Sequence, residues 1–269
     1  MKRGARFVRI AAACLACASL ATRAATPVIN DVSDLWFNPD ESGWGLNLIQ
    51  QGNIAFATLF VYDQNGRAHW FVASDLDGAP GARQAVFTGK LFETTGPVFS
   101  GPFNPANVTV REAGRMTFQL TPPDTGRLTY VVDGVTVDKQ VQRQTWASND
   151  LSGQYYGVRV TQLAASSPAC GARIGTQVFD TMDVSNLGGS FAMTATHGSP
   201  PDELCRYSGS YSQAGHMGTV DGNYSCNSGA SGTFTLTDVE GGRNGFFAGY
   251  VATDRTCRLV GNFSAVRRN

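Results

Sequence analysis

Residues 43–74 read GWGLNLIQQGNIAFATLFVYDQNGRAHWFVAS, and this stretch decides the fold class. Three apolar runs, at 43–50, 54–62 and 68–74, are separated by the short polar segments QGN and DQNG. Runs of this length, rich in Val, Phe and Tyr and bounded by turn residues, are typical of β-strands. Asn-Gly favours a tight turn because both residues tolerate positive φ. The stretch therefore predicts three consecutive antiparallel strands.

The same pattern continues along the chain. Glycine is frequent, at 31 of 269 residues, and helical periodicity is nearly absent. Turn residues recur every 8–12 positions, which is typical of antiparallel barrels and sandwiches. Besides the three runs above, we expect strands at 85–94, 107–111, 114–120, 127–132, 135–146, 153–163, 175–184, 189–196, 205–213, 218–226, 232–239, 246–252 and 257–266.

A domain boundary is expected near 147–150. Four cysteines lie after it, and the four tryptophans of the chain lie before it. The sequence predicts an all-β protein with two small antiparallel up-and-down barrels or sandwiches, at 32–146 and 150–269, each of about eight strands.

Both halves open with glycine followed by an aromatic residue, at Gly43-Trp44 and at Gly153-Gln154-Tyr155, and both end on a strand with arginine, Arg143 or Arg267. An inward arginine that stacks on the first-strand aromatic would cap one barrel end through a cation–π contact of about 1 kcal/mol. This arrangement is similar to that of calycin-like barrels, the lipocalin-like and avidin-like group. The alternative is a last strand that curls and shows both faces to water.

The segment Asn38-Pro39-Asp40-Glu41-Ser42-Gly43-Trp44-Gly45 continues into the strand pattern F-A-T-x-F-x-Y-D-x-x-G-x-x-x-W. Over 32–146 the chain resembles a repeated domain of exported bacterial proteins with an N-P-x-E-S-G-W-G motif. The second half looks like a cysteine-bearing β-domain that accompanies it. That family has no established activity, so the resemblance implies an architecture and no mechanism.

The first 25 residues are typical of a secretory signal peptide. Four basic residues up to position 9 precede an apolar run over 10–21, and small residues follow near Ala24 and Ala25. The run is too short to span about 30 Å of hydrocarbon. We expect a periplasmic or secreted protein without a membrane span.

Removal of residues 1–25 changes the charge. It leaves 16 basic and 21 acidic residues, a net charge of about −5. A weakly acidic chain has no electrostatic footprint for nucleic acid, and no cofactor or metal motif is evident.

Four cysteines remain after cleavage, and an even number in an oxidising compartment favours disulfides. Three pairings are possible. We expect Cys170–Cys205 and Cys226–Cys257, because each pair would join sheet neighbours. A zinc site is the alternative, but no close C-x-x-C pair is present.

Catalytic candidates are few. Asp40 and Glu41 are adjacent carboxylates in the turn before a strand, and they suit either acid–base chemistry or capping of backbone N–H groups. Ser42 lacks the G-x-S-x-G context of a hydrolase nucleophile. His69 is the histidine that shares a domain with Ser42, but nothing identifies a triad.

Aromatic residues give the stronger functional signal, because exposed rings bind sugars or apolar ligands and buried rings form a core. The strand at 54–62 is apolar on both faces, so we expect it to be buried on both sides, with its outer face against the second domain, another subunit or a ligand. The expected ligand-binding residues are Trp36, Trp44, Tyr62, Trp70 and Arg143.

Three functions compete. The first is a non-catalytic binding protein for a small apolar molecule or a carbohydrate. The second is an envelope structural protein that associates with itself. The third is a secreted hydrolase that uses Asp40 or Glu41. A cavity above roughly 300 Å³ would favour binding, whereas a hydrolase needs a cleft in which these acids face a partner.

Overall fold

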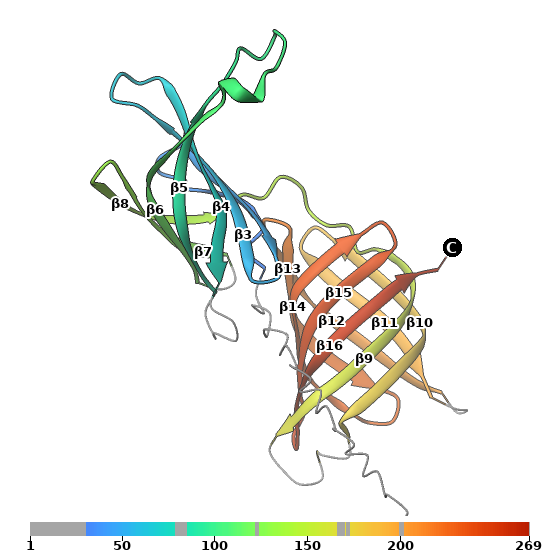
Figure 1. Ribbon diagram of the computed structural model, residues 1–269. Helices are drawn as coiled ribbons and strands as arrows, with labels where there is room; N and C mark the ends of the chain where they lie inside the picture. The colour runs from blue at the N-terminus through green and yellow to red at the C-terminus, as the bar shows by residue number, and fades with distance from the viewer. Residues whose placement is uncertain are drawn as a thin grey trace, which may run out of the picture.

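The computed structural model describes residues 31–78, 85–121, 124–165, 170, 173–198 and 202–268. In this part of the chain, strands form two closed antiparallel barrels of eight strands each, which confirms the expected all-β class. Figure 1 shows the two barrels as separate bodies joined by one connecting segment. The expected signal peptide at 1–25 lies outside the described residues. No helix among the described residues is long and apolar enough to cross a membrane.

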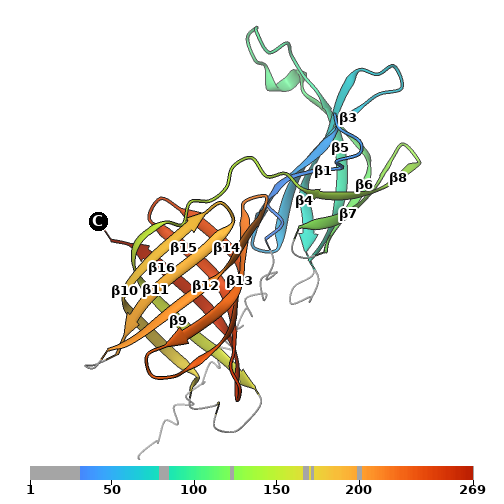
Figure 2. The same ribbon diagram turned by 180° about the vertical axis from the view of Figure 1, so that it is seen from behind.

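The first barrel closes by pairing of its first and last strands. Its strands are β1 (Asp34–Phe37), β2 (Gly45–Gln51), β3 (Ile54–Tyr62), β4 (Ala68–Gly78), β5 (Val86–Thr95), β6 (Thr109–Thr121), β7 (Thr125–Val132) and β8 (Val135–Arg143). A single 3₁₀ turn, η1 (Pro105–Asn107), lies in the long β5–β6 connection, which stands away from the barrel in Figures 1 and 2.

The second barrel closes in the same way, with its last strand against its first. Its strands are β9 (Gly153–Ala165), β10 (Gly175–Leu187), β11 (Ser190–His197), β12 (Glu203–Ala214), β13 (Met217–Cys226), β14 (Ser231–Gly242), β15 (Gly245–Thr253) and β16 (Arg258–Arg267). All eight strands expected after residue 150 are present, with ends that differ by a few residues.

The first barrel departs from expectation at two places. The short strand β1 was not expected, and it supplies the pairing partner that closes the barrel onto β8. The two strands expected at 107–111 and 114–120 are one strand, β6. A bulge at Ala113 shifts the register between β5 and β6 there, so a local bend in one strand resembles a turn in the sequence.

A clamp of one aromatic ring and one arginine closes each barrel. Trp36 pairs in register with Arg143, and Tyr155 pairs with Arg267. The guanidinium carbon lies 4.7 Å from the Trp36 ring centroid in the first barrel and 5.1 Å from that of Tyr155 in the second. The expected stacking is therefore present, but in the first barrel its ring is Trp36, whereas Trp44 lies 6.0 Å from Lys139.

The two clamps share further hydrogen bonds. Trp36 Nε1 donates to the carbonyl of Val32 at 2.9 Å, and the Tyr155 hydroxyl donates to that of Leu151 at 2.8 Å. Each arginine donates from Nη1 to the carbonyl of a serine three residues before the ring. These contacts come from the sequences DVSDLW (31–36) and DLSGQY (150–155), so the pattern D-x-S-x-x-aromatic occurs once in each barrel.

The disulfides differ from the expected pairing. They are Cys170–Cys257 and Cys205–Cys226. The β12–β13 hairpin turns on two residues between Ala214 and Met217, and this register places Cys205 directly opposite Cys226. The remaining cysteines then pair across a sequence separation of 87 residues. The expected pairing was wrong because it did not use the register set by that turn.

The tip of the β12–β13 hairpin docks on the first barrel. His216 Nδ1 lies 2.7 Å from Asp34 Oδ2, and His216 Nε2 lies 3.6 Å from Asp31 Oδ2. Asp34 also pairs with the buried Arg143 at 2.7 Å. Gly215 has φ +61°, and a Cβ there would lie 2.0 Å from Asp34 Oδ2, so only glycine permits this approach.

This junction is expected to loosen at alkaline pH. Hydrogen bonds to Asp31 and Asp34 raise the pKa of His216 to about 9. The protonated imidazole stabilises the contact fully at a pH below about 6.5, the ordinary pKa of histidine. This contribution to stability is lost as the pH rises through about 9. The radius of gyration from small-angle scattering should therefore grow between pH 7 and 10.

The variant His216→Ala is the control for this prediction. It removes the titrating group, so its radius of gyration should stay constant over the same range. A wild-type transition centred near pH 6.5 would show that the carboxylates do not hold the imidazolium.

Candidate functional site

At the end opposite its clamp, the described residues of the second barrel surround a mouth. A cavity of about 460 Å³ lies in this mouth, between the end of β9, the start of β10 and the facing ends of β11 to β13. A cavity of this volume falls within the range of small-molecule sites. Its lining includes Arg159, Thr161, Arg173, Gln177, His197, Glu203, Tyr207, Tyr224 and the Cys205–Cys226 disulfide.

Arg159 forms the floor of this cavity. Side chains alternate along β9, so Arg159 points inward with the buried Tyr155 and Gly157. Its Nε is buried without a hydrogen-bond partner, and Nη2 donates to Gln177 Oε1. No carboxylate pairs with Arg159 among the described residues, which include every Asp and Glu of the chain.

Two aromatic rings and the Gln177 amide oxygen contact the Arg159 guanidinium. Its guanidinium carbon lies 5.4 Å from the Tyr250 ring centroid and 5.9 Å from that of Phe179. Cation–π contacts recover part of the lost hydration, about 1–2 kcal/mol each when desolvated. A partly buried cation without an anion is costly, so this arrangement favours an incoming anion.

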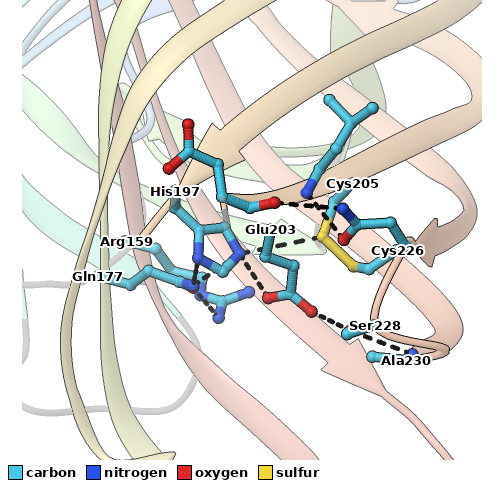
Figure 3. The surroundings of a disulfide bond; sticks show 11 residues. Arg159, Gln177, His197, Glu203, Cys205, Cys226, Ser228 and Ala230 are labelled. Atoms are coloured by element: carbon cyan, nitrogen blue, oxygen red, sulfur yellow. Dashed lines mark hydrogen bonds and ion pairs between the residues drawn. A yellow bond between two sulfur atoms is a disulfide. The ribbon is translucent and has the colours of Figure 1, made fainter. Parts of the chain in front are cut away.

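A hydrogen-bonded wall lies beside Arg159 (Figure 3). The Gln177 amide nitrogen is 2.8 Å from His197 Nδ1, and His197 Nε2 is 2.9 Å from Glu203 Oε2. Glu203 also accepts a hydrogen bond from the Ser228 hydroxyl. The Gln177 amide nitrogen also lies 2.9 Å from His197 Nε2, so both ring nitrogens of His197 are in contact with polar partners of the mouth.

His197 is neutral near pH 7. Burial lowers its pKa, and the nearby positive charge of Arg159 lowers it further. The negative charge of Glu203 raises the pKa of His197, but by less than burial and Arg159 together lower it. The mouth therefore presents a neutral imidazole beside the guanidinium of Arg159.

Two tyrosines form the opposite wall. The rings of Tyr207 and Tyr224 stack with centroids 5.7 Å apart, and burial raises the pKa of the Tyr207 hydroxyl, so it remains a neutral donor. Arg173 at the rim is already paired with Asp254. The mouth thus combines a recessed cation without an ion pair, flat rings, neutral hydrogen-bonding groups and the Glu203 carboxylate, which is held by His197 and Ser228.

Metal binding fits this site poorly. His197, Glu203 and Cys205 place their ligand atoms within 4.8 Å of one another. The Cys205 sulfur, however, is bonded to Cys226 and is not a thiolate. Two remaining donors are fewer than a zinc site uses.

Beneath the mouth the barrel is nearly filled. A space of about 30 Å³ remains between Arg159 and core rings such as Phe179, Phe234 and Phe263. This space is about the volume of one water molecule. A ligand of the second barrel would therefore sit in the polar mouth, above this core.

The expected catalytic residues lie in the other barrel and form no common cleft. Glu41 accepts hydrogen bonds from Lys139 Nζ at 2.7 Å and Trp44 Nε1 at 3.0 Å, and the Lys139 bond lowers its pKa. A carboxylate held ionised in this way is a poor general acid. Asp40 is exposed on its turn.

His69 and Ser42 do not make a catalytic pair. His69 Nε2 lies 3.1 Å from Glu93 Oε1, and Glu93 in turn pairs with Arg111. No hydrogen bond connects His69 with Ser42 in the described part of the chain. These contacts give His69 a structural role in an ion-pair network of the first barrel.

The expected ligand-binding residues separate into two groups. Trp36 is fully buried and Arg143 nearly so, and they form the clamp described above. Neither is accessible to a ligand. Trp44 is half-buried and packs against the first core. The Tyr62 hydroxyl donates to the carbonyl of Gly43 at 2.9 Å.

Tyr62 and Trp70 belong to an exposed apolar face. The strand β3 was expected to be buried on both sides, but its residues Phe56, Phe60 and Tyr62 are exposed. No described segment covers this side of β3, so the expected packing on the second barrel is not present, whereas its burial by another subunit or a ligand stays a prediction. Phe60 pairs with Trp70 across β3 and β4, so the rings lie side by side on the outer surface.

The mouth of the second barrel was missed from sequence, although one signal for it exists. Alternation from the aromatic Tyr155 places Arg159 inside any barrel that β9 helps to form. The other residues of the mouth come from separate strands, so only the closed barrel brings them together.

Comparison of the chain with protein-family models, with curated proteins and with solved structures finds no match. A function is therefore argued below from the residues of the chain itself.

Proposed function

We propose that the protein is an exported, non-catalytic binding protein, and that the mouth of its second barrel takes a small polar molecule with an anionic group. The observation that carries this proposal is Arg159, an inward cation on the cavity floor that lacks a carboxylate partner. A carboxylate or phosphate of a ligand would supply that partner through charge-assisted hydrogen bonds.

The rest of the mouth supports a ligand with a polar body. The stacked rings of Tyr207 and Tyr224 offer a flat apolar surface, and Gln177 and His197 offer amide and imidazole groups. An acidic sugar combines these properties, which narrows the expected carbohydrate class. An apolar molecule is less well supported, because only about 30 Å³ of space lies beneath the mouth.

Two wider relations form part of the same proposal. The ring–arginine clamp in both barrels supports a calycin-like relation. The N-P-x-E-S-G-W-G segment supports membership of the exported domain family for the first half. Two disulfides support folding in an oxidising compartment, periplasmic or extracellular. Localisation of the tagged full-length chain by cell fractionation tests this part.

Substitution Arg159→Gln tests the site directly. Inorganic phosphate, acetate and glucuronate are titrated into the oxidised protein and followed by NMR, with neutral glucose as a reference. Loss of a charge-assisted contact worth about 1.5–3 kcal/mol predicts binding of the anionic probes that is roughly 10–150-fold weaker. Arg243→Gln, at an exposed turn of the same barrel, should bind like wild type.

Stability separates a binding role of Arg159 from a structural role. A desolvated cation without an anion does not stabilise the barrel, so Arg159→Met should keep or raise the midpoint of thermal unfolding. Binding of glucose as strong as that of glucuronate, or a lower midpoint for Arg159→Met, would contradict the proposal.

A further inference from the structure

The first barrel carries an exposed protrusion, which we call the arm and define as residues 96–108. It joins β5 to β6, and its sequence GPVFSGPFNPANV contains no charged residue. Phe99 is 98% exposed and Phe103 is 69% exposed. Two highly exposed phenylalanines on an uncharged segment are unusual for a surface loop, where polar residues are expected.

The arm is an ordered element. The Gly101 N–H donates to the carbonyl of Val98 at 3.2 Å, and Asn104 caps the turn η1 by accepting from the Ala106 N–H at 3.0 Å. Three prolines restrict its backbone further. A stiff arm loses little conformational entropy when its rings are buried by a partner.

An apolar groove lies at the base of the arm. It has a volume of about 410 Å³ and is lined by Trp70, Val72, Phe92 and Val110, with Ser74 and Thr94 at its edges. The register between β4 and β5 shifts between Val72 and Asp77, next to the pair Val72–Phe92 that lines the groove. It continues into the exposed rings of β3 through the Phe60–Trp70 pair.

We propose that this groove receives the arm of a second copy of the chain, so that two molecules form a symmetric dimer by arm exchange. The arm connects β5 and β6, two of the strands that line the groove. The arm and the groove therefore form one continuous apolar patch on each copy. A two-fold axis near the arm base places each arm on the other groove and closes the assembly.

The charged residues around the groove favour the uncharged arm of a second copy over a charged partner. Lys90 pairs with Glu112 at 2.8 Å, and Arg111 pairs with both Glu93 and Asp133. These cations are neutralised within the same chain. The exposed Arg115, opposite Lys90 in the β5–β6 register, has no ion pair among the described residues. Neutralisation of most nearby cations disfavours an anionic membrane or a nucleic acid. The partner surface must be apolar and uncharged, as the arm is.

Sedimentation equilibrium of the oxidised chain without residues 1–25 tests the proposal. The wild type should show a concentration-dependent dimer. The arm variant Phe99→Ser/Phe103→Ser and the groove variant Trp70→Ser/Val110→Ser should each dimerise about 100-fold more weakly or worse, since buried aromatic anchors dominate interface energies. Thermal unfolding shows that each variant is folded.

A mixture of the two variants gives the decisive result. The arm variant retains its groove and the groove variant retains its arm, so one of the two contacts is restored in the mixed dimer. The mixture should therefore associate more strongly than either variant alone. The control Leu187→Ser/Phe247→Ser removes exposed apolar side chains of the second barrel and should dimerise like wild type.

Four outcomes would overturn arm exchange. The first is a wild type that stays monomeric at its highest soluble concentration. The second is a dimer that the arm substitutions do not weaken, and the third is a mixture that associates no better than its components. The fourth is arm-dependent binding of the monomer to neutral lipid vesicles, which would assign the patch to a lipid surface.

Discussion

Replacement of Trp36 by alanine is expected to lower the free energy of unfolding of the first barrel by about 3–5 kcal/mol. The ring is fully buried, packs edge-on against Phe118 with centroids 4.7 Å apart, and covers the guanidinium of Arg143. Its removal leaves a cavity and exposes one side of a buried ion pair. A domain with about 5–15 kcal/mol of stability loses a large part of it.

Urea titration followed by tryptophan fluorescence measures this effect. The remaining tryptophans, Trp44, Trp70 and Trp146, lie in the first barrel or just after it. Trp36→Phe keeps most of the packing but loses the hydrogen bond to Val32, so it should cost less than the alanine variant, with about 1 kcal/mol from that bond.

Trp146→Ala is the matched control, because Trp146 is 77% exposed just after the same barrel and lies outside the groove. Its effect should be below that of Trp36→Phe. An alanine variant at position 36 that is as stable as the Trp146 variant would show that the clamp does not stabilise the barrel.

Removal of the Cys170–Cys257 disulfide by double alanine substitution is expected to destabilise the second barrel by about 4–5 kcal/mol. The bridge closes a loop with a sequence separation of 87 residues, and the constraint that a disulfide places on the unfolded chain grows with loop length. The Cys205–Cys226 bridge, with a separation of 21, should contribute about 3 kcal/mol.

The two barrels should respond independently to this change. Far-UV circular dichroism reports both, whereas tryptophan fluorescence reports the first barrel, which contains no cysteine. The fluorescence midpoint should therefore stay constant while the second transition moves to lower denaturant. A larger loss for the Cys205–Cys226 variant would contradict the loop-length argument.

Much of the fold could be predicted from the sequence because strands and turns leave local signals. Apolar runs of 7–10 residues and turn residues such as Asp133-Gly134 located most strands. The eight strands of the first barrel were nevertheless counted with two compensating errors, at β1 and β6. A four-residue strand is too short to show a period, and a bulge interrupts alternation as a turn does.

Contacts that form only when the strands pair into a closed barrel were harder to predict. The pairing of Cys205 with Cys226 follows from the hairpin at Gly215-His216 once that turn is fixed, but the turn was not used. The pattern D-x-S-x-x-aromatic was visible in both halves at Trp36 and Tyr155. Its importance lies in hydrogen bonds to backbone carbonyls, which only the structure displays.

The clamps also determine when each barrel can close during synthesis of the chain. The Asp34–Arg143 pair joins residues 109 positions apart, and the Ser152–Arg267 bond joins residues 115 positions apart. A chain made from its N-terminus therefore presents an open sheet with two unpaired edges until its last strand emerges. At 5–20 residues per second this interval lasts roughly 5–20 s for each barrel. During that time edge strands can pair with other chains, so the last strand of each barrel sets the period in which the nascent protein is most exposed to aggregation.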